Sequence, residues 1–197
     1  MKKSRLFSAL ILSASLACGT VLAGDIDPAK VPDIKKTEAQ LYLSPKEVFE
    51  MKKSGGDKVL LLDIRTGPEL EYVGAADIID AHIPYTVDDP VSWDDKRKSY
   101  KKDANSNFLT KFHEWADKKG IGKDDTIILM CRSGDRSAKA ADLLTKAGYT
   151  KAYSAVEGFE GDKAKDGENK GKRTVNGWKN AGLPWGYDLV KEKMYFE

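Results

Sequence analysis

The chain is poor in cysteine and histidine, with two of each in 197 residues. Two cysteines make at most one bridge, which excludes a fold held together by several disulfides. Long apolar runs are also missing, apart from one stretch at the N-terminus, and this excludes a protein that spans a membrane several times. The histidines are not spaced with cysteines or carboxylates as metal ligands are, so no metal site is predicted.

The first 23 residues are typical of an export signal. Three basic residues precede an apolar stretch from Leu6 to Leu16, and small residues lead up to a cleavage site near Ala23. The apolar stretch is shorter than the ~20 residues that a membrane span needs. We therefore expect a periplasmic or secreted chain that begins at Gly24 and has no membrane span. Two alternatives stay open, an uncleaved membrane anchor and a lipoprotein anchored at Cys18.

Removing this segment changes the sign of the net charge. Three of the 33 Lys and Arg residues and none of the 31 Asp and Glu residues lie in it, which leaves 30 basic and 31 acidic side chains in residues 24–197. Basic runs such as Lys96-Arg97-Lys98 are interleaved with aspartates. We expect a solvated surface there and no nucleic-acid partner.

Residues 24–40 are polar, contain two prolines and predict an irregular N-terminal leader, so we expect a single domain over residues 41–197. Ser44-Pro45-Lys46-Glu47 predicts a helix start, with Ser44 as the N-cap and Glu47 completing a capping box. Two further helices are predicted, one over residues 108–119 after Asn107 as a cap, and one that begins at Ser137 and ends at Gly148.

Short apolar runs at 59–64, 126–130 and 152–156 predict buried strands. Strands that alternate with helices at this spacing indicate an α/β fold, a layered sandwich with a mostly parallel central sheet flanked by helices. Two charged segments interrupt the pattern. We expect residues 88–106 to be a loop insertion and residues 161–177 to be a mobile insertion.

The strand that ends at Met130 runs directly into the segment Cys131-Arg132-Ser133-Gly134-Asp135-Arg136-Ser137. The N–H groups at the start of the next helix lack internal partners and carry partial positive charge. A curled loop adds further N–H donors, and Arg132 and Arg136 bracket the same point. These features favour the thiolate of Cys131 and predict a nucleophile for an anionic electrophile. Asp135 weakens this positive site unless its carboxylate points outward or pairs with an arginine.

Four motifs in this order resemble the rhodanese family of sulfurtransferases, in its single-domain exported form, over roughly Ser44 to Trp185. The cysteine segment is similar to the family's Cys-Arg-x-Gly-x-Arg-Ser/Thr loop. The other three are Asp63-Ile64-Arg65-Thr66 with Glu69, Ala81-His82-Ile83-Pro84, and Val156-Glu157-Gly158-Phe159 with Trp178-Lys179-Asn180-Ala181-Gly182-Leu183-Pro184. The chain departs from the family pattern at Gly74-Ala75-Ala76 and at Glu157.

This resemblance implies a three-layer rhodanese-like sandwich and a two-step transfer of sulfane sulfur. The Cys131 thiolate would take sulfur from thiosulfate or a similar small anionic donor. The resulting persulfide would pass it to a thiol, to cyanide or to a partner protein, with no metal or organic cofactor. Cys131 and Arg136 are the implied catalytic residues, Arg132 and Arg136 would orient the sulfonate oxygens, and the substrate site would consist of Arg132, Ser133, Gly134, Asp135 and Ser137.

The upstream motifs are expected to support this loop. Asp63 either orients Arg136 or the loop backbone, or is an ordinary carboxylate at a strand end. Arg65 and Glu69 are expected to form a structural ion pair, and His82 to support the loop by hydrogen bonding.

Two other functions stay open. One is a sulfur-carrier or redox-sensing module that serves a partner protein. The other is a cysteine-dependent phosphatase or arsenate reductase, whose loops resemble Cys-x5-Arg. Four residues separate Cys131 from Arg136 here, and the shorter ring is cramped for a tetrahedral phosphoryl group.

Overall fold

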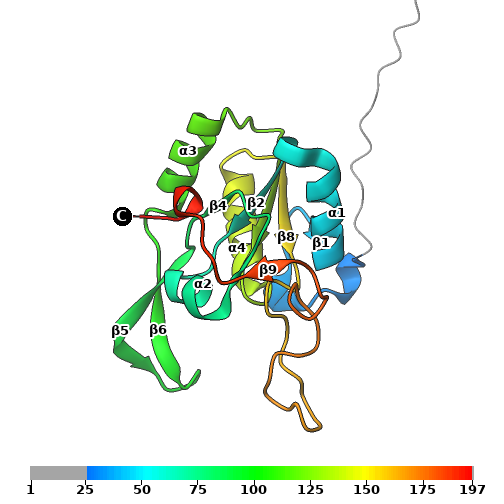
Figure 1. Ribbon diagram of the computed structural model, residues 1–197, viewed down its shortest axis with the longest axis vertical. Helices are drawn as coiled ribbons and strands as arrows, with labels where there is room; N and C mark the ends of the chain where they lie inside the picture. Colours follow the sequence, from blue (N-terminus) through cyan, green and yellow to red (C-terminus); the bar gives the residue numbers. More distant parts are fainter. Residues whose placement is uncertain (1–25, 197) are drawn as a thin grey trace, which may run out of the picture.

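The computed structural model describes residues 26–196 and forms a layered α/β fold (Figure 1). The predicted export signal over residues 1–23 and the alternative anchor at Cys18 lie outside the described residues. None of the helices within 26–196 is long and apolar enough to cross a membrane.

The central sheet has five strands in the order β1-β8-β7-β2-β4, and every neighbouring pair is parallel. This confirms the mostly parallel sheet. The strands are β1 (Tyr42–Leu43), β8 (Lys151–Ala155), β7 (Thr126–Met130), β2 (Val59–Asp63) and β4 (Ala81–His82). A two-stranded antiparallel pair beside it consists of β3 (Ala75–Ala76) and β9 (Trp185–Gly186).

Helices cover both faces of this sheet, which gives the three predicted layers. They are α1 (Pro45–Gly55), α2 (Gly67–Val73), α3 (Phe108–Lys119) and α4 (Asp135–Lys146), with single 3-10 turns at η1 (Pro28–Lys30), η2 (Asp33–Lys35), η3 (Gly56–Lys58) and η4 (Lys191–Lys193). One core cluster joins α3 and α4 to the sheet, and the other joins α1 and α2 to the opposite face. Alternate residues of β2 divide between them, with Leu60 and Leu62 in the first and Leu61 in the second. Since β2 is buried on both faces, its sequence is continuously apolar.

Local sequence signals explain the helix ends. The amide of Ser44 donates to Glu47 Oε2 at 2.7 Å and its hydroxyl accepts from the Glu47 amide at 3.4 Å, which confirms the predicted capping box. Helix α3 has the predicted bounds and ends at Gly120. Its cap differs from the expectation: the Asn107 side chain makes no cap hydrogen bond, and the Asn107 amide donates to Asn105 Oδ1 at 3.0 Å.

Helix α4 begins two residues earlier than predicted, at Asp135. The apolar periodicity starts only at Ala138, but Gly134 adopts φ of 99° and turns the chain into the helix directly after the cysteine loop. Ser137 therefore lies inside the first turn of α4.

The predicted loop insertion over residues 88–106 is wrong in its secondary structure. It is a hairpin of β5 (Thr86–Asp94) and β6 (Ser99–Ala104), which projects from the body of the molecule (Figure 1). A register irregularity lies between Asp89 and Trp93, and neither strand has a buried face. The alternation of apolar and polar residues that identifies a strand in a sequence is therefore missing.

The leader and the second insertion pack at the same edge of the sheet as the cysteine loop. The leader is not wholly irregular, since it contains η1 and η2, and its Val31 is buried against Tyr42 and Val156. Residues 161–177 form a long loop after β8 (Figure 1), held by isolated bridges such as Lys163–Arg173. Because parallel strands end at one edge, this loop and the cysteine loop after β7 lie at the same end of the sheet.

Candidate active site

Cys131 follows the last residue of β7 and lies immediately before the first turn of α4. The residue is fully buried. The Gly134 amide donates to the Cys131 sulfur at 3.1 Å, so the loop curls around the sulfur as the sequence predicts. A backbone N–H group at a helix N-terminus stabilises negative charge on the atom that it faces.

The cysteine loop is fixed from behind by the chain that follows β8. The Phe159 amide donates to the Cys131 carbonyl at 2.8 Å, and the Glu160 amide donates to the Arg132 carbonyl at 2.9 Å. Gly158 has φ of 67°, and a Cβ atom there would lie 2.6 Å from backbone atoms of the loop. Gly158, which follows the departure from the family pattern at Glu157, thus allows two backbone segments to touch.

Ser137 supports this loop, and its expected place in the substrate site stays a prediction. Its hydroxyl is fully buried and accepts a hydrogen bond from the Cys131 amide at 2.8 Å. That bond closes the loop across its base and fixes the direction of the Cys131 side chain.

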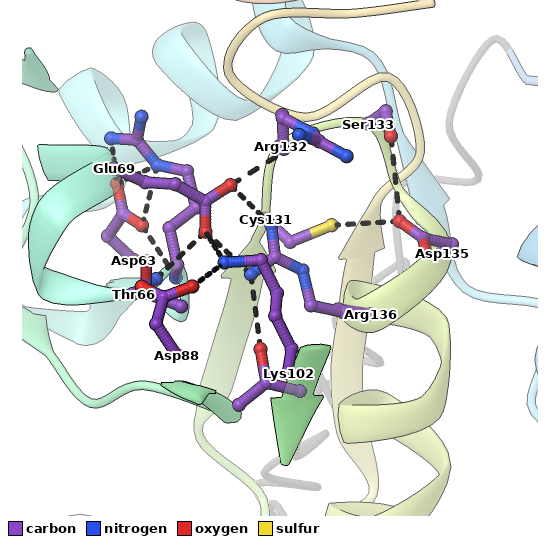
Figure 2. Close-up of polar contacts among 12 residues, drawn as sticks. Asp63, Thr66, Glu69, Asp88, Lys102, Cys131, Arg132, Ser133, Asp135 and Arg136 are labelled. Atoms are coloured by element: carbon purple, nitrogen blue, oxygen red, sulfur yellow. Dashed lines mark hydrogen bonds and ion pairs between the residues drawn. The ribbon is translucent and has the colours of Figure 1, made fainter. Parts of the chain in front are cut away.

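Asp135 points at the sulfur, and not outward. Its Oδ1 lies 3.8 Å from the Cys131 sulfur and 3.5 Å from the Ser133 hydroxyl (Figure 2). In its thiol form Cys131 donates to this carboxylate, and a thiolate would face it as a like charge. The charge that the sequence marked as unfavourable for an anion site is therefore directly beside the nucleophile.

Arg136 is bound to the carboxylate of Glu69. Its Nη1 and Nη2 donate to the two oxygens of Glu69 at 2.8 and 2.7 Å, and Nη1 also lies 3.4 Å from the Thr86 hydroxyl of the hairpin. The expected pairing of Glu69 with Arg65 is therefore wrong, and Arg136, which the resemblance assigns to the sulfonate, is bonded to Glu69 in this structure. Figure 2 shows the Arg136 side chain extending to Glu69, while the Cys131 sulfur is directed to Asp135.

The charges of this pair stabilise each other. Burial alone would raise the pKa of Glu69, but the hydrogen bonds and charge of Arg136, with the Thr66 amide and Lys102, lower it to about 2. Burial works against the charged form of Arg136, but Glu69, with smaller contributions from Cys131 and Asp135, raises the pKa of this guanidinium above its ordinary value. Both side chains stay ionised in the folded protein at neutral pH.

Asp63 and Arg65 form a second, separate pair, so Asp63 does not orient Arg136. The Arg65 Nη2 donates to Asp63 Oδ2 at 2.6 Å and to the Gly74 carbonyl at 2.8 Å, and both charged side chains are fully buried. The Arg65 guanidinium also lies 3.9 Å from the centre of the Phe159 ring. Phe159 carries the amide that binds the Cys131 carbonyl, so this pair supports the active-site loop indirectly.

His82 contacts the Arg65 backbone, its Nε2 lying 2.8 Å from the Arg65 carbonyl oxygen. Burial lowers its pKa, against the opposing charge of Asp63. It therefore supports the motif that contains Arg65, and not the cysteine loop itself.

Arg132, unlike Arg136, has a guanidinium group that is not bound bidentately to a carboxylate, so this cation of the cysteine loop is available to an anionic ligand. Its side chain is one-third exposed, and its Nε atom, which lies 4.0 Å from Glu69 Oε1, has no hydrogen-bond partner among residues 26–196. Gly134 contacts the sulfur through its amide N–H, and the Ser133 hydroxyl lies 3.5 Å from Asp135 Oδ1.

Sequence reasoning missed the contribution of the hairpin. Lys102, taken for solvated surface, is largely buried, pairs with Asp88 and lies 3.9 Å from Glu69 Oε2. Thr86 contacts Arg136. No local pattern marks either residue, because both reach the site only through the pairing of β5 with β6.

The family model for the rhodanese-like domain matches residues 44–165. An uncharacterised protein of Rickettsia conorii is 32% identical over 133 residues, which cover 66% of this chain and 84% of that protein. A relative from Rickettsia prowazekii, also uncharacterised, is 31% identical over 135 residues with the same coverage. Among solved structures, Rv0390 from M. tuberculosis matches with a TM-score of 0.55 and 28% identity, covering 75% of this chain and 97% of that one.

Proposed function

Because the chain belongs to the rhodanese-like domain family, we propose that it is a sulfurtransferase that holds sulfane sulfur as a persulfide on Cys131. The observation that carries the proposal is the Gly134 amide 3.1 Å from the sulfur at the start of α4. The same N–H group would stabilise the terminal sulfur of a persulfide anion, as an oxyanion hole stabilises an oxyanion.

Thiosulfate, or a similar small anionic donor, supplies the sulfur in this proposal. The Cys131 thiolate attacks the outer sulfur of thiosulfate, a new S–S bond forms, and sulfite leaves with the electron pair of the broken S–S bond. The persulfide anion then gives its terminal sulfur to cyanide, as thiocyanate, or to a thiol, and the Cys131 thiolate is restored. These residues require no metal or organic cofactor for either step.

Access to the sulfur requires motion at the rim of the site. Cys131 is fully buried, the Asp135 carboxylate lies 3.8 Å from its sulfur, and Arg132 is the next residue of the loop. Arg132 is one-third exposed, and neither residue is held by a salt bridge shorter than 4.0 Å to another described residue. These two side chains are therefore the ones that we expect to move when a donor enters.

A sulfur carrier fed by a partner protein is the second candidate, and the charge beside the sulfur favours it. Asp135 repels a dianion, and Arg136 is neutralised by Glu69. A protein persulfide carries less charge than thiosulfate and meets less repulsion at this position. The Cys-x4-Arg spacing continues to oppose a phosphatase.

Turnover of the purified protein distinguishes these functions. With thiosulfate and cyanide, the account predicts thiocyanate formation that Cys131→Ser abolishes while the unfolding midpoint stays close to that of the wild type. Turnover of an aryl phosphate in place of thiosulfate would assign a phosphatase. Thiocyanate formation by the Cys131→Ser protein would remove Cys131 from the mechanism.

A further inference from the structure

Arg136 is not free to act as a second cation beside Arg132 for a sulfonate donor, because it is bonded to Glu69. We propose that Arg173, from the long loop over residues 161–177, supplies it and binds the sulfonate oxygens of the donor together with Arg132. This inference rests on the proposed function, since the ligand is the small anionic donor of that reaction. It assigns a role to a segment that the sequence marked only as an insertion.

The hydrogen bonds place the Arg173 guanidinium next to the cysteine loop. Arg173 Nη1 donates to the Gly161 carbonyl, and the amide of the same Gly161 donates to the Arg132 carbonyl at 3.1 Å. One residue therefore connects the guanidinium of Arg173 to the backbone of Arg132. Arg173 is far from Cys131 in the sequence. It reaches the cysteine loop because the second arm of the loop over residues 161–177 runs back toward Gly161.

The base of this loop is fixed by close backbone contacts and hydrogen bonds. Gly161 has φ of 83°, and a Cβ atom there would lie 1.8 Å from the Asn176 carbonyl oxygen, so the two arms of the loop touch through their backbones. The Asn180 side chain donates to the Arg173 carbonyl at 3.2 Å and to the Asn176 carbonyl at 2.7 Å. Asp162 is further tied to the buried Lys35 of the leader. These contacts hold Arg173 beside Gly161, which is itself hydrogen-bonded to the cysteine loop.

The charges of the two arginines point to an anion. Arg173 is partly buried and forms no salt bridge with another described residue. Burial and the charge of Arg132 lower the pKa of Arg173, against opposing contributions from Glu160, Asp162 and Asp135. Arg132 has its own unpartnered Nε atom. The oxygens of a sulfonate between two guanidinium groups would relieve their repulsion and accept hydrogen bonds from their N–H groups.

Thiosulfate binding to the Cys131→Ser protein, measured by titration calorimetry, tests this role without turnover. Adding Arg173→Met to that protein should weaken binding at least about tenfold, the loss expected for a hydrogen bond to a charged group. Arg173→Lys keeps the charge but loses the planar fork, and should give an intermediate affinity. Lys172→Met is the matched control, because it removes one exposed positive charge from the same loop, and should change affinity less than about twofold.

Equal affinities for Arg173→Met and Lys172→Met would overturn the inference, as would the absence of thiosulfate binding while Arg173 is intact. Unfolding midpoints identify a variant that fails to fold. If the Arg173→Met protein does not fold, the Arg173→Lys protein is used in its place. A thiosulfate affinity of the folded Arg173→Lys protein equal to that of the protein with Arg173 intact then overturns the inference. Turnover of the wild type is measured beside these titrations. If the wild type turns over thiosulfate but the variants bind it equally well, the role of Arg173 is refuted and the sulfurtransferase function stands. If binding depends on Arg173 but the wild type shows no turnover, the sulfurtransferase reaction is refuted and the role of Arg173 in binding stands.

Discussion

The carboxylate nearest to the nucleophile belongs to Asp135, whose Oδ1 lies 3.8 Å from the Cys131 sulfur. A unit charge at about this distance from another is worth roughly 1 kcal/mol even in a well-solvated site. Asp135→Asn should therefore lower the KM for thiosulfate about fivefold, and Asp135→Lys should lower it further. The KM for cyanide, measured in the same assay, should change less because cyanide carries a single charge.

Asp166→Asn is the control for the Asp135 variants, since it removes one exposed negative charge from the loop over residues 161–177. Its KM for thiosulfate should match that of the wild type. A clearly higher KM for thiosulfate in a folded Asp135→Lys protein would show that the carboxylate helps the donor to bind, against the electrostatic reasoning.

Glu69 links the pH dependence of stability to the site. Its folded pKa of about 2 lies below the ordinary value of 4.5, so its stabilising contribution is complete above pH 4.5 and is lost as pH falls toward 2. A shift of this size corresponds to about 3 kcal/mol. Glu69→Gln should cost roughly 3–5 kcal/mol at pH 7, because Arg136 stays buried without its partner. The difference from the wild type should shrink by about 3 kcal/mol between pH 6 and pH 2.

Urea unfolding at a series of pH values measures this difference. Glu71→Gln, at an exposed position of the same helix, should follow the wild type at every pH. A wild-type advantage over Glu69→Gln that stays constant down to pH 2 would mean that the Glu69–Arg136 pair does not control this part of the pH profile.

The contact between two loops explains why Gly158 cannot carry a side chain. Gly158 and Gly182 have nearly the same φ, 67° and 69°, but a Cβ atom at Gly182 meets nothing within 4 Å, while one at Gly158 lies 2.6 Å from the cysteine loop. Both Ala variants should lose about 1–2 kcal/mol from left-handed backbone strain. Gly158→Ala alone should also lose at least about tenfold in thiosulfate turnover, because the loop is displaced.

Turnover and urea unfolding of the two variants separate strain from displacement. If Gly158→Ala keeps the turnover of Gly182→Ala, the close approach of residues 158–161 does not hold the cysteine loop in its active form.

The sheet and its helices could be predicted because their signals are local. The capping box at Ser44 and the apolar run before Cys131 each lie within a few residues, and the structure places both as expected. The hairpin of β5 and β6 could not be predicted, because its strands have no buried face that would impose an alternating pattern of apolar and polar residues. An element stabilised mainly by cross-strand pairs such as Trp93 with Tyr100 leaves little trace in its composition.

In the candidate active site, too, contacts between residues close in sequence could be predicted, and contacts between distant residues could not. Cys131 and the Gly134 amide that contacts it lie within one short segment, so this contact could be predicted. The partner of Arg136 could not, since Glu69 is 67 residues away and Arg65 is an equally plausible partner by sequence. Which carboxylate meets which arginine depends on how α2 packs against the end of β2, and only the tertiary structure fixes that.

In the molecule as a whole, the leader is part of the folded domain. Val31 packs with Tyr42 and Val156, Lys35 pairs with Asp162, and the Thr37 amide donates to the Tyr42 hydroxyl at 2.8 Å. A chain that begins at residue 41 should therefore melt roughly 5–10 °C below one that begins at residue 26, from the loss of about 2–3 kcal/mol of apolar burial. Thermal unfolding compares the two, and equal midpoints would show that residues 26–40 add nothing to the stability of the domain.

In the proposed reaction one thiol of this fold carries a persulfide, and the mass of the intact protein reveals it. The reduced protein is incubated with thiosulfate and no acceptor. Its intact mass is then measured by mass spectrometry, and the protein is digested for peptide mapping. The account predicts a protein one sulfur atom heavier, with the added mass on the peptide that contains Cys131 and its release by cyanide. Cyanide release also separates one added sulfur from two oxygens gained by over-oxidation of the thiol. An unmodified mass under excess thiosulfate, with the thiol verified as reduced, would contradict thiosulfate as the donor and leave the protein-fed carrier.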